Sequence, residues 1–316
     1  MQDAIKEIIN AHLGRVLVNE KISNYTTYRV GGKVRCICYP KGEAELIKLI
    51  EILKRRNIKY FTLGNGSNVL FSDLMYDGVI IKLDNFNKIE INDDEIYVEA
   101  GYPLIKLANV AVKNGLAGLE FASGIPGTVG GALFMNSGAY GQDMSKIVTS
   151  ARILTDEGIK EYSNSELEFS YRTTVLQKHL VYVCLSVKLK LTHGNSEELE
   201  EIVRLRREQR RNSQPLSLPS AGSVFRNPPG RYAGEIIESL GLKGYTVGRA
   251  EVSPKHANFI VNNGNAKASD IKNIIDYIKL KAKNKYGINL HVEQRLINWV
   301  GVDEKESESE EEENQN

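Results

Sequence analysis

The pattern of apolar and polar positions predicts a chain in which helices and strands are mixed. Aliphatic residues recur at helical spacing in 43–56 and 269–286, which we expect to be amphipathic helices. Pro103 is typical of a first helical turn, and predicts a further helix that ends near Gly115. Alternating residues on both sides of Asn92-Asp93-Asp94 predict a β-hairpin over 89–98. Short apolar or alternating runs predict further strands at 59–63, 79–83, 147–155, 158–162, 181–191 and 295–300.

A basic helix is expected between Asn195 and Pro215. Asn195, with Glu198 three residues later, is typical of a capped helix start. The commonest explanation of its arginines is a solvated helix face, and the alternative is an electrostatic funnel for phosphates. These arginines are Arg204, Arg206, Arg207, Arg210 and Arg211. Prolines and serines in 214–230 indicate the entry to another domain, which continues with a helix over 232–240.

Composition places the chain among globular proteins. With 316 residues, 41% of them hydrophobic and 26% charged, it can bury the cores of two or three domains. No apolar run approaches a membrane span and the first residues lack a secretory signal, so we expect a cytoplasmic protein. Cys36, Cys38 and Cys184 give no disulfide framework. Cys36 and Cys38 share one face of a strand and are better explained as core than as metal ligands, and we predict no metal site.

The formal charge of +1 conceals an asymmetry. Residues 303–313 carry eight acids and one lysine, a net charge of −7, which leaves +8 on the remainder. The low-complexity end, 303–316, cannot bury apolar surface, and we predict a disordered acidic tail. The positive remainder suits an anionic small molecule at least as well as a nucleic acid.

Two neutral glycine-rich loops carry the main chemical signal. The first, 64–68, reads GNGSN after a short apolar run, and the second, 124–141, reads GIPGTVGGALFMNSGAYG. Each alone could be a tight connection. Together they favour a cofactor diphosphate held by backbone N–H groups rather than by lysines, with Ser67, Asn68 and Ser123 adding side-chain donors. The third glycine of a dinucleotide-binding fingerprint is missing, and no P-loop is present.

Six segments, in order, give the chain a specific resemblance. It resembles the UDP-N-acetylenolpyruvoylglucosamine reductase family over about residues 24–300, and Lys255-His256-Ala257-Asn258 is similar to its second subtype, which lacks a substrate-covering loop. The segments are GNGSNVLFSD (64–73), GIPGTVGGALFMNSGAYG (124–141), SYRTT (170–174), AGSVFRNP (221–228), VSPKHANFIVN (252–262) and EQRLI (293–297).

The resemblance implies an α+β fold. It comprises a vanillyl-alcohol-oxidase-type FAD-binding region in two lobes and a smaller α/β substrate-binding domain. We place lobe 1 at 1–83, completed by 288–302, lobe 2 at 84–205, and the substrate domain at 206–287. FAD is the implied cofactor and NADPH the hydride donor. The implied FAD-binding residues are Gly64, Asn65, Gly66, Ser67, Asn68, Ser123, Gly124, Ile125, Pro126, Gly127, Thr128, Gly130, Gly138 and Ala139.

The resemblance also implies the chemistry. Hydride from flavin N5 reduces the enolpyruvyl C=C bond of UDP-N-acetylenolpyruvoylglucosamine to give UDP-N-acetylmuramate for bacterial peptidoglycan. Arg172 matches the arginine that holds the substrate carboxylate, and Ser223 matches the proton donor. Glu293 matches the glutamate that polarises the enolate. Without the motifs, these residues would be explained as a surface arginine, a turn serine and a partner of Arg295.

The anionic UDP group of the implied substrate is in keeping with the positive charge. Ser213 stands where the family pattern has a lysine, so Arg210 or Arg211 is expected to take over diphosphate binding. The implied substrate-binding residues, besides Arg172, are Arg226, Asn227, Lys255, His256 and Asn258. We expect no nucleic acid, membrane or obligate protein partner. The alternatives are another flavin oxidase or dehydrogenase of the superfamily, or a UDP-sugar-binding protein without catalysis.

Overall fold

The computed structural model describes residues 1–301, and the predicted acidic tail, 303–316, lies outside them. The chain forms two compact units. The first unit contains 1–20, 34–65 and 77–209, and the second unit contains 21–33, 66–76 and 210–301. The second unit therefore includes two short segments from the N-terminal quarter. The predicted lobe and domain boundaries stay predictions.

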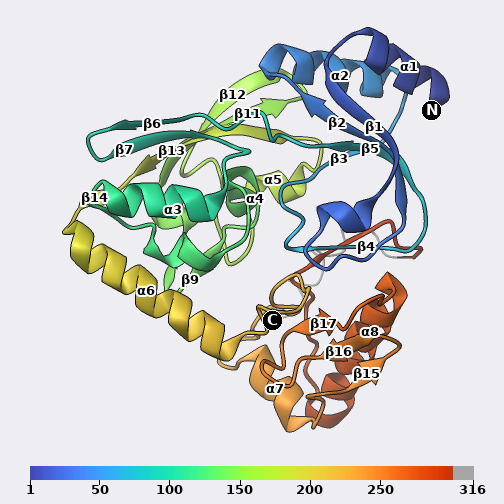
Figure 1. Ribbon diagram of the computed structural model, residues 1–316, viewed down its shortest axis with the longest axis vertical. Helices are drawn as coiled ribbons and strands as arrows, with labels where there is room; N and C mark the ends of the chain where they lie inside the picture. The colour runs from blue at the N-terminus through green and yellow to red at the C-terminus, as the bar shows by residue number, and fades with distance from the viewer. Residues whose placement is uncertain (302–316) are drawn as a thin grey trace. The chain divides into compact units, whose positions relative to one another are not determined.

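A five-stranded antiparallel sheet forms the larger part of the first unit. Its strand order is β12-β11-β13-β7-β6, and α3 (Leu104–Lys113) and α4 (Val129–Phe134) lie on one side of it (Figure 1). The hairpin predicted over 89–98 is confirmed as β6 and β7. The strands are β6 (Ile89–Asn92), β7 (Glu95–Glu99), β11 (Val148–Thr155), β12 (Gly158–Ser163) and β13 (Val183–Lys190).

A four-stranded sheet, of order β1-β2-β5-β3, forms the other part. Leu46, Leu49 and Leu53 of α2 pack into the same buried cluster as Cys36 and Cys38 of β2. The core explanation of these two cysteines is confirmed. The elements are α1 (Gln2–Asn10), β1 (Gly14–Lys21), β2 (Lys33–Pro40), α2 (Glu43–Arg55), β3 (Tyr60–Thr62) and β5 (Tyr76–Ile81).

Further elements complete the first unit. The predicted basic helix is α6, and the side-chain oxygen of Asn195 accepts the N–H groups of Glu197 and Glu198 at its start. These elements are β8 (Leu116–Ala117), η2 (Glu120–Gly124), β9 (Gly138–Ala139), β10 (Gln142–Asp143), η3 (Met144–Lys146), α5 (Val175–Lys178), β14 (Thr192–His193) and α6 (Ser196–Ser213), of which the last few residues enter the second unit.

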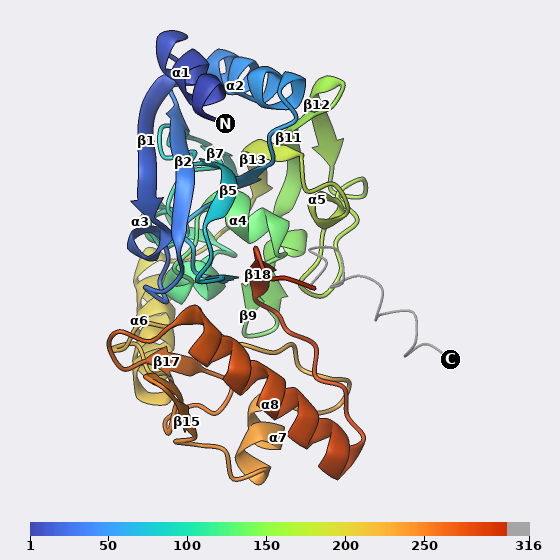
Figure 2. The same cartoon turned by 90° about the vertical axis from the view of Figure 1, so that its right-hand side faces the viewer.

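The second unit has its own core. The long helix α8 packs against the antiparallel sheet β15-β16-β17, with α7 beside it (Figure 2). Gly287, at a φ of 69°, ends α8 as predicted. A parallel pair joins β4 to β18. The elements are η1 (Ile22–Tyr25), β4 (Val69–Phe71), α7 (Ala233–Ser239), β15 (Thr246–Val247), β16 (Ala250–Val252), β17 (Ile260–Asn262), α8 (Ala268–Tyr286) and β18 (Arg295–Ile297).

The predicted α+β mixture is confirmed. The predicted strand 295–300 is shorter, and ends at Ile297, because its pairing with β4 ends there. Among residues 1–301, no helix is both long and apolar enough to cross a bilayer.

Candidate active site

Residues from the two glycine-rich segments are joined within the first unit. The side-chain amide of Asn65, in loop 64–68, donates a hydrogen bond to the carbonyl of Pro126 over 3.3 Å. The partner residue lies in the second loop, 124–141. Residues about sixty positions apart are therefore neighbours in the first unit.

Close packing explains why loop positions are glycine. A Cβ on Gly64 would lie 2.7 Å from the hydroxyl oxygen of Thr128, which itself accepts the N–H of Gly131 at the start of α4. A side chain at Gly64 would therefore push Thr128 away from this cap. Gly127 has no heavy atom within 4 Å of its Cβ position, so the backbone there faces open space.

The backbone N–H groups of loop 64–68 show whether a cofactor diphosphate fits there. Among residues 1–301, the backbone N–H groups of Asn65, Gly66 and Ser67 have no hydrogen-bond partner. Gly66 has a φ of 63°, and its carbonyl accepts the N–H of Thr27, which fixes the turn. Consecutive N–H groups of this kind bind anions well, because unpaired donors in a half-buried loop are costly. The loop therefore fits the diphosphate of FAD.

The other predicted cofactor residues lie in the same segment, but Ser123 differs from the expectation. Its hydroxyl donates to the carbonyl of Glu120 over 2.8 Å and is buried, so its proton is already used within the protein. Gly138 belongs to β9, where a Cβ would lie 2.5 Å from Asp143. The rest of the predicted set in this segment is Gly124, Ile125, Gly130 and Ala139.

Arg172 has an unusual backbone and lies at this segment. Its φ is 61°, a left-handed conformation that is rare and costly for a long side chain. The Nη2 atom donates to the carbonyl of Gly138 over 2.9 Å, and the Arg172 carbonyl accepts from the amide of Gln177. Strain of this kind is typical of functional positions, which supports the predicted role.

The second unit brings Ser223 and Glu293 onto paired segments. The N–H of Glu293 donates to the carbonyl of Val224 over 2.8 Å, although seventy positions separate the two predicted catalytic residues. Asn68 donates its side-chain amide to the Glu293 carbonyl over 3.2 Å. The Ser223 hydroxyl is half-buried and has no hydrogen-bond partner within residues 1–301. It is therefore available to a ligand.

A buried clamp that we did not predict holds the turn before Ser223. The amide nitrogen of Gln294 donates to the carbonyls of Ala221 and Gly222, over 3.1 and 3.3 Å. Its oxygen accepts the hydroxyl of Tyr28 over 3.1 Å. Burial raises the pKa of Tyr28, so this phenol stays a donor. The one sequence signal was a glutamine between Glu293 and Arg295, directly before β18.

The side chain of Asn258 is used inside the protein. It is 4% exposed, and its amide both accepts the N–H of Phe225 and donates to the Phe225 carbonyl. This geometry fixes the Ser223 segment rather than reaching a ligand. Asn227 accepts the N–H of Ala233, at the start of α7.

Two further predicted substrate residues are basic. Lys255 donates to the carbonyl of Arg211 over 2.5 Å. His256 contacts the Phe259 ring, and burial lowers its pKa, so that the ring is neutral at pH 7. The prediction that Arg226, Lys255 and His256 contact substrate stays a prediction.

Two basic residues near the cofactor loops make contacts that the sequence did not predict. Lys82 donates to the carbonyl of Gly64 and so supports the backbone of the first loop. Arg207 points inward, and donates to the carbonyl of Ser123 and the side chain of Asn109. The solvated-face explanation holds for Arg204, which pairs with acids on its own helix.

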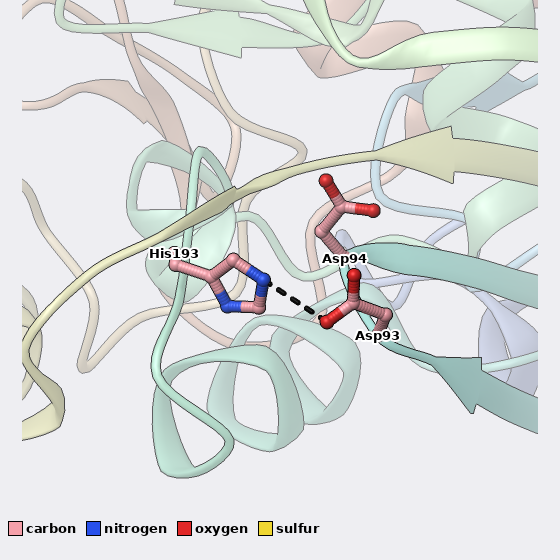
Figure 3. Close-up of side chains that lie close together, drawn as sticks. All are labelled: Asp93, Asp94 and His193. Carbon is pink, nitrogen blue, oxygen red and sulfur yellow. Dashed lines mark ion pairs between the residues drawn. The ribbon is translucent and has the colours of Figure 1, made fainter.

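The structure also groups Asp93, Asp94 and His193. His193 turns toward the hairpin between β6 and β7, with its Nε2 atom 3.0 Å from Asp93 (Figure 3). Asp94 is already paired with Lys190 over 2.6 Å, and that hydrogen bond lowers the pKa of Asp94. We treat the group as a surface ion-pair cluster.

Known proteins resemble most of the chain. Residues 34–161 match the family described as FAD binding domain, and 214–297 match UDP-N-acetylenolpyruvoylglucosamine reductase, C-terminal domain. Reductases of that name from Anoxybacillus flavithermus and Bacillus subtilis are 45% and 41% identical over 299 residues, which are 94% of this chain and 99% of each relative. The crystal structure of the Thermus caldophilus enzyme aligns with a TM-score of 0.74 and 32% identity, over 90% of this chain and 98% of that one.

Proposed function

Because the chain belongs to the UDP-N-acetylenolpyruvoylglucosamine reductase family, we propose that it reduces UDP-N-acetylenolpyruvoylglucosamine to UDP-N-acetylmuramate with NADPH as the electron source. It is an FAD-containing oxidoreductase of peptidoglycan synthesis, and the FAD-binding region predicted from the sequence is confirmed. The choice of NADPH and the residue roles below are proposals.

The substrate determines what the side chains must do. Its enolpyruvyl ether is an alkene conjugated to a carboxylate, so adding hydride to the terminal carbon places negative charge on the neighbouring carbon and the carboxylate. We assign the carboxylate to Arg172, whose planar guanidinium can hold two oxygens. Its strained backbone and its hydrogen bond to Gly138 support a fixed orientation.

We assign the proton to Ser223. When bound, FAD supplies the hydride that it receives from NADPH. The Ser223 Oγ–H then gives its proton to the carbon beside the ether oxygen, and the serine oxygen recovers a proton from solvent. A weak acid suffices because the carbanion is strongly basic, and a neutral hydroxyl does not repel the substrate carboxylate. We propose that Glu293, in protonated form, donates a hydrogen bond to the forming enolate.

The observation that carries this proposal is the Ser223 hydroxyl, which lacks an internal partner among the described residues while its segment is fixed by Glu293, Gln294 and Asn258. Stopped-flow absorbance separates the two half-reactions. In Ser223→Ala, NADPH should reduce the flavin at the wild-type rate, whereas reoxidation by the enolpyruvyl nucleotide should slow about 10²–10⁴-fold.

A matched control is Ser220→Ala, three residues earlier on the same segment, which should leave both half-reactions unchanged. Fast reoxidation of Ser223→Ala by the nucleotide would reject the proton-donor role. Reoxidation by dioxygen at a rate comparable with the nucleotide would instead favour an oxidase.

A further inference from the structure

Lys82 is a charged residue in an apolar setting. It directly follows β5, in the run Val79–Leu83, and it is 6% exposed. Its backbone N–H donates to the carbonyl of Cys38 in β2, so it lies inside the sheet. Burying an ammonium group costs free energy unless it is paired. Lys82 therefore needs partners whose interactions compensate for its desolvation.

Its principal partner is the first glycine of the cofactor loop. The Nζ atom donates to the carbonyl oxygen of Gly64 over 2.5 Å, whereas the carboxylate of Asp84 is 3.4 Å away and half-exposed. Hydrogen bonds from a charged donor are about twice as strong as neutral ones. The Gly64 carbonyl is thus held toward the sheet interior.

The planarity of the peptide transmits this constraint to the next residue. In a trans peptide, the carbonyl of one residue and the N–H of the next point in opposite directions. Because the Gly64 carbonyl faces Lys82, the N–H of Asn65 faces away from the sheet. This N–H has no hydrogen-bond partner within residues 1–301. The side chain of Asn65 fixes the same residue from the other side through Pro126.

We propose that Lys82 is a positioning residue for the cofactor, which locks the Gly64–Asn65 peptide so that the Asn65 N–H binds the FAD diphosphate. This inference rests on the FAD-binding role of the loop. Lys82 also places a positive charge beneath a loop whose other donors are neutral. Without it, the peptide is held less firmly and can rotate to present its carbonyl to the anion, which would repel it.

The test is the FAD dissociation constant of the apo-protein, measured by the change in flavin fluorescence. Lys82→Met keeps the apolar stem and removes the charge. We expect a rise in Kd of about 10- to 100-fold, which corresponds to about 1.4–2.8 kcal/mol at 1.4 kcal/mol per tenfold change. Asp84→Asn is the matched control, because it alters the weaker partner and leaves the bond to Gly64 intact. Its Kd at pH 7 should stay within about twofold of wild type.

The pH dependence separates positioning from simple packing. Burial lowers the pKa of Lys82, while Asp84 acts in the opposite direction. On the neighbouring strands, Tyr39 interacts with Asp84, and Arg15 interacts with Tyr39. As the pH rises through the pKa of Lys82, the ammonium is lost and its bond to Gly64 weakens. The ratio of the Kd of Lys82→Met to that of wild type should therefore fall at alkaline pH.

The outcomes are distinct. Equal Kd values for wild type and Lys82→Met, or a ratio that does not change with pH, would overturn the role of Lys82. If Lys82→Met does not fold, Asp84→Asn decides the matter. Asp84 favours the ammonium form of Lys82, so in Asp84→Asn this ammonium is lost at a lower pH. As the pH is raised, FAD affinity should therefore begin to fall at a lower pH in Asp84→Asn than in wild type. The same dependence of Kd on pH in both proteins would overturn the proposal. A wild-type protein that binds no FAD would instead refute the flavin-dependent reaction itself.

Discussion

Replacing Gln294 by leucine should loosen the turn that carries Ser223. The glutamine is 3% exposed and connects three groups of the second unit, the carbonyls of Ala221 and Gly222 and the hydroxyl of Tyr28. Leucine has a similar volume but can make none of these bonds. The substitution therefore removes the hydrogen bonds with little change in packing.

The magnitude follows from the groups left unpaired. Ala221 and Tyr28 are fully buried, so water cannot replace their lost partner, whereas Gly222 is partly exposed. Each buried group without a partner costs about 1–3 kcal/mol. We expect the free energy of unfolding to fall by about 2–5 kcal/mol. Because a misplacement of about 1 Å can cost about 10²-fold in rate, we also expect slower reoxidation by the nucleotide, with flavin reduction unchanged.

Trp299 provides the assay. It is the only tryptophan of the chain, it belongs to the second unit, and its ring N–H donates to the carbonyl of Leu70 over 2.9 Å. Its fluorescence during urea unfolding therefore reports on the unit that contains Gln294. Tyr28→Phe is the partner variant, since it removes the hydroxyl that Gln294→Leu would orphan.

The double variant gives the decisive comparison. If the clamp is one network, the two changes are not additive. The loss in free energy of unfolding of the double variant Gln294→Leu/Tyr28→Phe should be smaller than the sum of the two single losses, by about 1 kcal/mol or more. Additive effects, or a loss below about 0.5 kcal/mol for Gln294→Leu, would refute the reasoning. An unchanged reoxidation rate would show that the clamp does not position Ser223.

Two further predictions concern the loops. Gly66→Ala should lower FAD affinity and stability by more than Gly230→Ala, because both glycines have positive φ but only at Gly66 would a Cβ meet a carbonyl, 2.4 Å away at Tyr25. Equal melting-temperature losses would contradict this. Arg172→Lys should lower kcat/KM for the nucleotide about 10²–10³-fold with flavin reduction by NADPH unaffected, since lysine cannot hold two carboxylate oxygens. Stopped-flow measurements of both half-reactions check this, and unchanged turnover would exclude the assigned role.

The local pattern of the sequence determined most elements. The helices at 43–56 and 269–286 were visible because an amphipathic face repeats every 3.6 residues. The helix over 103–115 was visible because proline and glycine mark its two ends. The hairpin over 89–98 was visible because side chains alternate along a strand. The glycine-rich composition also pointed to the cofactor loops. Where backbone segments approach closely, a Cβ does not fit, and the sequence shows this directly as glycine.

What only the tertiary structure decided are contacts between residues distant in the chain. Lys82 lay in a predicted strand and Gln294 directly before one. Both looked like ordinary polar residues, because a sequence does not reveal which carbonyl a buried donor will meet. The inclusion of 21–33 and 66–76 in the second unit was equally hidden. Spacing along the chain encodes local geometry, whereas the partner of a buried polar group depends on how separate segments fold together.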